Sequence, residues 1–150
     1  MPSHSETRTL PYSADLMYAV VSGVEKYPLF LPWCLGLRVL SRETLDAQEV
    51  LRAEMLVGFG GLRERYISRV ALDPGARTVD VTQIEGVFRQ LETHWRFTPQ
   101  GEGCEVSFSI VFEFKNRLLN AVAGKAFEKV LLQMTDAFEA RAKALSDKPA

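Results

Sequence analysis

Glu64 and Tyr66 are the side chains whose types and spacing come nearest to acid–base chemistry. They lie two residues apart in the alternating stretch LRERYISRVAL, so a strand would place both on one face. In an apolar cavity, desolvation could favour the protonated carboxyl of Glu64 and suit it to general-acid work. A neighbouring arginine or Gln83 could equally satisfy that carboxyl, and no second catalytic partner is evident. We therefore expect no catalytic residue and no enzyme.

Two cysteines and two histidines are the remaining candidates for metal or redox chemistry. Cys34 and Cys104 lie far apart and form no C-x-x-C pair, which predicts free thiols in a reducing compartment. With His4 and His94 they would need carboxylates to complete a zinc site, so we expect no metal and no cofactor. The glycine cluster at 58–61 leads into an alternating strand pattern instead of a helix, which favours a hairpin turn over a phosphate-binding loop.

The composition is typical of a globular protein. Of 150 residues, 47% are hydrophobic and 25% charged, which predicts one domain over residues 1–150 with a disordered tail from about residue 146. The net charge of −1 provides no basic field, so nucleic acid is not an expected partner. No apolar run approaches the ~20 residues that cross a bilayer, and MPSHSETRTL resembles no signal or transit peptide. We expect a cytoplasmic protein, with peripheral contact at the inner membrane left open.

The elements that must position these side chains follow from hydrophobic periodicity. A first strand over 3–10 precedes one or two short helices, the first of them capped by Ser13. Period-two runs then predict a meander of further strands, and a step of three and four predicts one long helix from Arg117 to about Leu145. We expect an α+β fold in which a curved antiparallel sheet of about seven strands wraps around that helix. The further strands are expected at 36–44, 48–59, 62–72, 77–85, 88–98 and 104–115.

Turn geometry predicts which side chains face each other. A two-residue turn at 60–61 pairs Phe59 with Leu62 and, further along, Met55 with Tyr66. A second two-residue turn at 74–75 would pair Val70 with Val79. The inner face is then almost wholly apolar, and its polar exceptions are Glu64, Tyr66, Ser68, Gln83 and Thr93.

One helix is too narrow to fill a sheet of this width. Seven strands span roughly 30 Å, whereas a helix covers ~10 Å. A cavity with apolar walls and a few convergent polar groups would remain, as in small-molecule sites. The alternative is that the large side chains pack solid.

The stretch VEKYPLFLPWCLGL, residues 24–37, carries an unusual apolar load for a segment without regular structure. Pro28 and Pro32 exclude an ordinary helix or a central strand here. One interpretation is a lid that places Phe30, Leu31 and Trp33 at the mouth of the cavity. Ordinary packing under the sheet edge is the alternative.

Four stretches resemble the coenzyme Q-binding START-domain family of the START, or polyketide cyclase, superfamily: YPLFLPWC (27–34), GFGGLRERY (58–66), LETHWRFTP (91–99) and VSFSIVFEFKNRLL (106–119). The resemblance runs from about Thr9 to Lys143 and implies a helix-grip fold. It implies a non-catalytic protein that binds ubiquinone or a related polyprenyl quinone and supports respiration or quinone synthesis. It also favours the lid interpretation, with transient membrane contact during ligand transfer.

The expected ligand site follows from the inner face and this resemblance together. The sheet and helix residues expected to contact the lipid, with the lid, are Phe30, Leu31, Trp33, Met55, Val57, Glu64, Tyr66, Val81, Gln83, Trp95, Phe108, Ile110, Phe112, Val122, Phe127 and Val130.

A sister branch, the bacterial ribosome-association toxin, shares the YPxFLP stretch and the FEF strand, so a ribosomal partner is the alternative function. The outward arginines at 52, 63, 65 and 69 would suit RNA, and a solvated surface is the simpler account of them.

Overall fold

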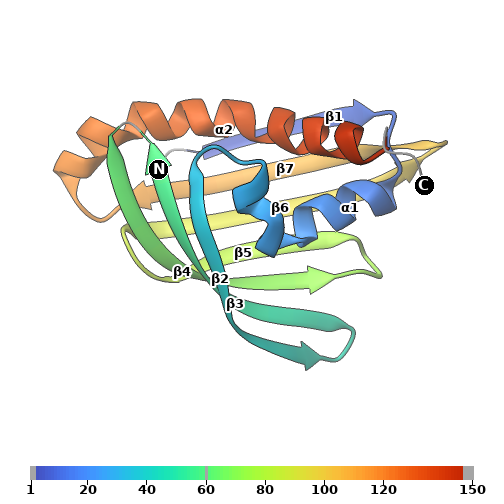
Figure 1. The fold of residues 1–150 in the computed structure, drawn as a ribbon, viewed down its shortest axis with the longest axis horizontal. Coiled ribbons are helices and arrows are strands. Elements are labelled where there is room, and N and C mark those ends of the chain that lie inside the picture. Colours follow the sequence, from blue (N-terminus) through green and yellow to red (C-terminus); the bar gives the residue numbers. More distant parts are fainter. Residues whose placement is uncertain (1–2, 60, 147–150) are drawn as a thin grey trace.

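The computed structural model describes residues 3–59 and 61–146 of the chain (Figure 1). The elements in chain order are β1 (Ser3–Leu10), α1 (Ala14–Ser22), the 3-10 helix η1 (Val24–Leu29), β2 (Cys34–Leu45), β3 (Gln48–Phe59), β4 (Leu62–Asp73), β5 (Thr78–Glu85), β6 (Phe88–Gln100), β7 (Gly103–Phe114) and α2 (Arg117–Ser146). The predicted α+β order is confirmed. The tail expected to be disordered, residues 147–150, lies outside the described residues.

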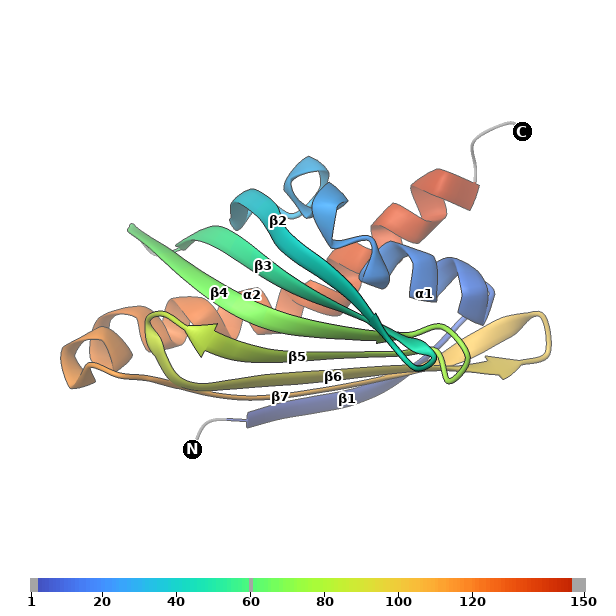
Figure 2. The ribbon, with the colours of Figure 1, turned by 90° about the horizontal axis from the view of Figure 1, so that it is seen from below.

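The seven strands form one antiparallel sheet in the order β1-β7-β6-β5-β4-β3-β2. The sheet curves strongly, and both α2 and α1 lie on its concave side, as Figure 2 shows from below. The long helix therefore crosses the inside of the curve, as the helix-grip arrangement requires. None of the helices described is both long and apolar enough to cross a membrane.

Local signals account for where the helices begin. Ser13 caps α1, because its hydroxyl accepts a hydrogen bond from the Leu16 amide at 3.1 Å. Asn116 accepts from the Leu118 amide at 2.8 Å at the start of α2. Asn120 in the first turns of α2 hydrogen-bonds both the amide and the carbonyl of Phe114, which ties the helix to the end of β7.

The predicted register is correct for one hairpin and wrong for the next. Met55 faces Tyr66 across β3 and β4 as predicted. Across β4 and β5, however, Val70 faces Val81, not Val79. The connection covers residues 74–77 and is longer than the two-residue turn expected. Asp73 accepts a hydrogen bond from the Ala76 amide at 3.0 Å, which stabilises this longer turn.

A polar seam joins the first strand to the last helix. Arg8 on β1 lies 2.7 Å from Asp136 and 3.3 Å from Glu139 on α2. Next to it, the Thr135 hydroxyl, which is fully buried, donates to the Glu6 carboxylate. The two ends of the chain are thereby held together across the edge of the sheet.

Candidate functional site

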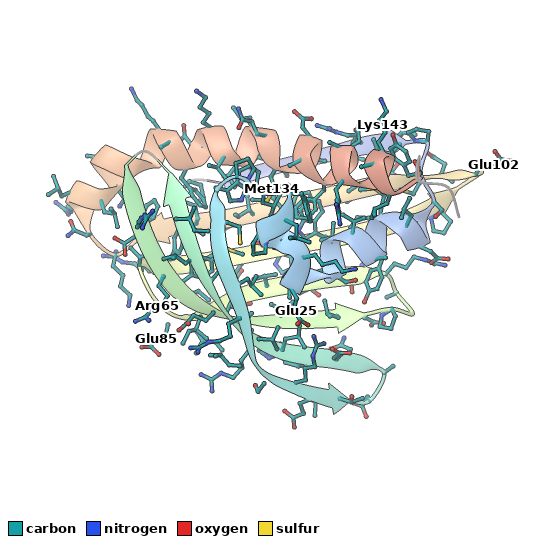
Figure 3. The ribbon with its side chains drawn as sticks, viewed as in Figure 1. Glu25, Arg65, Glu85, Glu102, Met134 and Lys143 are labelled. Carbon is teal, nitrogen blue, oxygen red and sulfur yellow. The ribbon has the colours of Figure 1, made fainter. Side chains whose placement is uncertain are left out.

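A partly enclosed apolar cavity lies between the concave face of the sheet and α2. Its volume is about 100 Å³. Met134 lies on the part of α2 that contributes to the wall, whereas charged residues such as Arg65, Glu85 and Lys143 lie at the periphery (Figure 3). The lining residues are Val24, Tyr27, Leu31, Trp33, Leu37, Ala53, Met55, Val57, Tyr66, Ser68, Val70, Val81, Leu91, Thr93, Trp95, Ile110, Phe127, Val130, Met134 and Phe138.

The structure brings a large part of the expected ligand site together around this cavity. Every second residue along parts of strands β2 to β7 faces the cavity, and one face of α2 provides further lining residues. The expected residues that line the cavity are Leu31, Trp33, Met55, Val57, Tyr66, Val81, Trp95, Ile110, Phe127 and Val130.

Two phenylalanines of the expected site lie behind the wall. Phe108 is buried against Trp95, with ring centres 4.3 Å apart, and Phe112 against Phe127 at 4.5 Å. Both therefore support lining residues without facing the free space. The side chain of Val122 lies outside the described part of the chain.

Gln83 and Glu64 also lie away from the cavity. The Gln83 amide accepts a hydrogen bond from the Phe88 amide at 3.0 Å and donates to the Phe88 carbonyl at 2.6 Å, so its polar group closes the β5–β6 connection. Glu64 is only two residues from the start of β4, at the end of the sheet next to the β3–β4 turn, and is half-buried there. The pairing of Glu64 with Tyr66 on one face does not bring a carboxylate into the cavity wall.

The proline-rich segment is packed more deeply than the lid interpretation assumed. Leu31 and Trp33 are only 3% and 9% exposed, so for these two residues the structure favours the alternative of ordinary packing. Phe30 is half-buried and contacts α2, with its ring 5.6 Å from that of Phe138 and 5.3 Å from the Arg141 guanidinium. The exposed large apolar residues of this segment are Leu29, at 71%, and Leu35, at 43%.

Several lining residues were missed by the expectation. Ser68 and Thr93 were on the predicted inner face; alternation along β6 also places Leu91 on the face of Thr93, and the spacing of three and four along α2 places Met134 and Phe138 on the face of Val130 and Leu131, so the sequence carried a signal for these residues. Tyr27 and Val24 come from η1, whose irregular backbone has no periodicity from which their direction could be inferred.

The two tyrosines of the cavity are held neutral. Burial raises the pKa of both Tyr27 and Tyr66 above the usual value of 10.0. The Tyr27 hydroxyl donates to the Val21 carbonyl at the end of α1. The Tyr66 hydroxyl donates to the Met55 sulfur at 3.3 Å, and its ring stands edge-on to Phe88 at 5.5 Å.

A glycine determines how closely the β5–β6 connection approaches Tyr66. A Cβ atom at Gly86 would lie 2.4 Å from the Tyr66 Cβ and 2.9 Å from its Cα. Gly86 also has a φ of +151°, which other residues rarely adopt. The absence of a side chain at this position therefore lets the connection pack directly on the backbone of Tyr66.

The thiols do not contribute reactive chemistry to the site. Cys34 and Cys104 are buried and unpaired with each other. Burial raises the pKa of Cys34 to about 11, which keeps its thiol protonated. Among the described residues, no three or more His, Cys, Asp or Glu side chains are grouped to hold a metal ion.

Known proteins with the same architecture match most of the chain. The family described as polyketide cyclase / dehydrase and lipid transport matches residues 10–139. The mitochondrial coenzyme Q-binding protein COQ10 homolog B of Xenopus laevis is 38% identical, over 93% of this chain and 57% of its own length. The ribosome association toxin RatA of Escherichia coli K12 is 35% identical, over 95% of this chain and 88% of its own length.

A solved structure agrees with these sequence matches. The solution structure of an 18 kDa protein from Caulobacter crescentus is 37% identical and superposes with a TM-score of 0.81, over 99% of this chain and 100% of that one. The predicted START-like resemblance is thereby confirmed. With the family match covering residues 10–139, the chain belongs to the polyketide cyclase / dehydrase and lipid-transport family.

Proposed function

We propose that this protein binds a neutral polyprenyl quinone in the cavity between the sheet and α2 and acts as its carrier. The cavity is the observation that carries the proposal, because its wall is apolar apart from a few hydroxyl, indole and thioether groups. The likeness to a frog protein named as coenzyme Q-binding supports the choice of a quinone. This chain spans 57% of that protein's length.

The cavity is smaller than most ligand pockets. Such pockets commonly measure ~300–1,000 Å³, whereas this cavity measures about 100 Å³. Binding a prenyl lipid therefore requires the wall to open or the tail to extend beyond it. Part of the wall is formed where the two helices η1 and α2 meet. There the ring centres of Tyr27 and Phe138 lie 5.3 Å apart. We propose that separation at this contact admits the ligand.

The direct test is the identity of the co-purifying lipid. Protein produced in its native host is extracted with organic solvent, and the extract is analysed by mass spectrometry. A polyprenyl quinone at near-stoichiometric amount supports the proposal. Absence of any quinone, together with no saturable binding of decyl-ubiquinone, contradicts it.

Tryptophan emission provides the titration. Trp33 and Trp95 both line the cavity, so a bound quinone should quench them. Val81→Phe places a larger side chain in the cavity wall and should weaken decyl-ubiquinone binding at least tenfold. Ile84→Phe is the matched control, because Ile84 lies on the same strand and is 48% exposed. Equal binding by the two variants would place the ligand elsewhere.

Binding without turnover is the second part of the proposal. The cavity wall contains hydroxyls, indoles and thioethers, and the candidate acid Glu64 is not part of it. Quinone should therefore be recovered chemically unchanged after long incubation, and Glu64→Gln should bind as well as the parent. If the parent protein converts the quinone and Glu64→Gln does not, the protein is an enzyme.

We expect peripheral membrane contact at η1. Leu29 is 71% exposed and next to the segment that closes the cavity. Leu29→Gln should reduce co-flotation with phosphatidylcholine liposomes while leaving decyl-ubiquinone affinity unchanged. If flotation is unaffected, the contact is not made at η1.

Ribosome association is the second candidate function. The likeness to RatA covers 88% of that protein. A pair of arginines on the outer face of the sheet also favours ribosome association. Arg52 and Arg69 lie directly opposite each other on β3 and β4, and neither has an ion-pair partner among the described residues. Two like charges facing each other are unfavourable without a counter-charge, which a phosphate backbone would supply.

Sedimentation separates this candidate from the first. Arg52→Glu with Arg69→Glu should abolish co-sedimentation with large ribosomal subunits at near-physiological salt, if the association exists. Lys125→Glu with Lys129→Glu, a matched charge change on the exposed side of α2, is the control. A parent protein that does not pellet with ribosomal subunits removes this candidate.

A further inference from the structure

Two hydroxyl groups in the cavity wall have no hydrogen-bond partner among the described residues. Ser68 on β4 and Thr93 on β6 are 5% and 8% exposed, and both line the cavity. Neither hydroxyl hydrogen-bonds another group in the part of the chain that the structure describes, residues 3–59 and 61–146. The residues are buried, yet neither oxygen is among the buried unpaired side-chain atoms, so both oxygens remain reachable from the free space of the cavity. These two hydroxyls are therefore available to a molecule inside the cavity.

Tyr66 adds a donor whose present partner is poor. Its hydroxyl donates to the thioether sulfur of Met55 at 3.3 Å, and thioether sulfur is a weak acceptor. Burial raises the pKa of Tyr66, so the hydroxyl keeps its proton. The edge-on contact with Phe88 and the close approach of Gly86 hold the ring in place. A carbonyl or ether oxygen near this hydroxyl would be a better acceptor than the sulfur.

The three groups share one region of the concave face. Ser68 faces Gln83 on β5, and Thr93 faces Val81, two residues along the same strand. Ser68 and Thr93 thus lie on either side of β5, roughly 12 Å apart at the backbone when the two-residue offset is combined with the spacing of two strands. Tyr66 lies two residues from Ser68 on the same side of β4. A ring-sized group could contact hydroxyls from both strands.

The chemistry of these groups selects the kind of head group. Hydroxyls carry no charge, and the cavity wall contains no lysine, arginine, histidine or carboxylate among the described lining residues. A phosphate or carboxylate would be buried here without a counter-charge, at high cost. A neutral ring that bears carbonyl or ether oxygens would satisfy the hydroxyls at no such cost.

We infer that Ser68, Thr93 and Tyr66 form the head-group site of the cavity and hydrogen-bond the oxygens of a neutral, carbonyl-bearing ring. This inference rests on the proposed function and specifies which part of the lipid is recognised. The apolar remainder of the wall contacts the tail by shape alone, so affinity depends on the ring oxygens as well as on tail length.

Three conservative variants test the site with decyl-ubiquinone as the probe. Ser68→Ala, Thr93→Val and Tyr66→Phe each remove one hydroxyl with little change of shape, and each should weaken binding roughly three- to tenfold. Tyr18→Phe and Thr82→Val make the same chemical changes at positions outside the cavity wall and should bind as the parent does. Decanoate, whose head is charged, should bind at least tenfold more weakly than decyl-ubiquinone.

Thermal stability without ligand gives an independent measurement. Because the Ser68 and Thr93 hydroxyls make no hydrogen bond to another described residue, Ser68→Ala and Thr93→Val break none and should melt at or above the parent's temperature. A parent that binds decyl-ubiquinone while all three variants bind it equally well overturns the head-group site and leaves the proposed function standing. A parent that binds no decyl-ubiquinone overturns both.

Discussion

Phe138 is the side chain on which α2, η1 and the sheet meet, and its replacement by alanine should destabilise the fold strongly. It is 2% exposed, and its ring lies 5.3 Å from Tyr27, 5.6 Å from Phe30 and 5.2 Å from Trp95. Truncating a buried phenylalanine costs ~3–5 kcal/mol. Loss of three ring pairs, each worth ~0.5–1.5 kcal/mol, places Phe138→Ala towards the upper part of that range.

Urea unfolding followed by circular dichroism measures this change. Leu132→Ala is the control, because Leu132 lies on the same helix and is 63% exposed, so its free energy of unfolding should change by less than ~0.5 kcal/mol. For a chain of this size, Phe138→Ala should also lower the melting temperature by roughly 10 °C. A loss below ~1 kcal/mol, or one equal to that of Leu132→Ala, would refute the reasoning that this contact closes the cavity wall.

Three further predictions concern the backbone, the tyrosines and the thiols. Gly86→Ala should lower the free energy of unfolding by more than ~1 kcal/mol, because the added Cβ would collide with Tyr66. Gly124→Ala is the control: Gly124 has open space around it, so alanine there should raise the free energy of unfolding by ~0.5–1 kcal/mol. The urea midpoints of the two variants test this difference. Because the folded pKa of Tyr27 and Tyr66 is raised above the unfolded value of 10.0, stability should be level below pH 10.0 and fall above it, by ~1.4 kcal/mol per pH unit and tyrosine; a midpoint that is unchanged to pH 11 would contradict this. With burial raising the pKa of Cys34 to about 11, a chromogenic disulfide reagent at pH 8 should modify the thiols only after denaturation.

The sequence was sufficient for most of the fold because its turns and periodicities are local signals. Alternation placed Met55 opposite Tyr66 correctly, since Phe59 faces Leu62 at the end of β3 and β4 as expected. The β4–β5 register failed because Pro74-Gly75 suggested a two-residue turn, while the Asp73 side chain stabilises a longer one. Side-chain-to-backbone bonds of this kind depend on geometry that composition does not show.

The candidate site was predictable only where periodicity controls direction. Alternation placed Met55, Trp95 and Ile110 in the cavity wall, but it could not distinguish a residue facing free space from one buried behind it, such as Phe108. The direction of Tyr27 is determined by a 3-10 turn and by its contact with α2, which only tertiary packing determines.

The polar seam between β1 and α2 has a consequence for the order of folding. Arg8 and Asp136 are 128 residues apart along the chain, and β1 pairs only with β7 among the strands described. During synthesis the first strand emerges long before either partner exists, while the meander from β2 to β7 can form through local hairpins. Docking of β1 and α2 is therefore a late event with high contact order. Variants of Arg8 should accelerate unfolding while leaving the folding rate nearly unchanged.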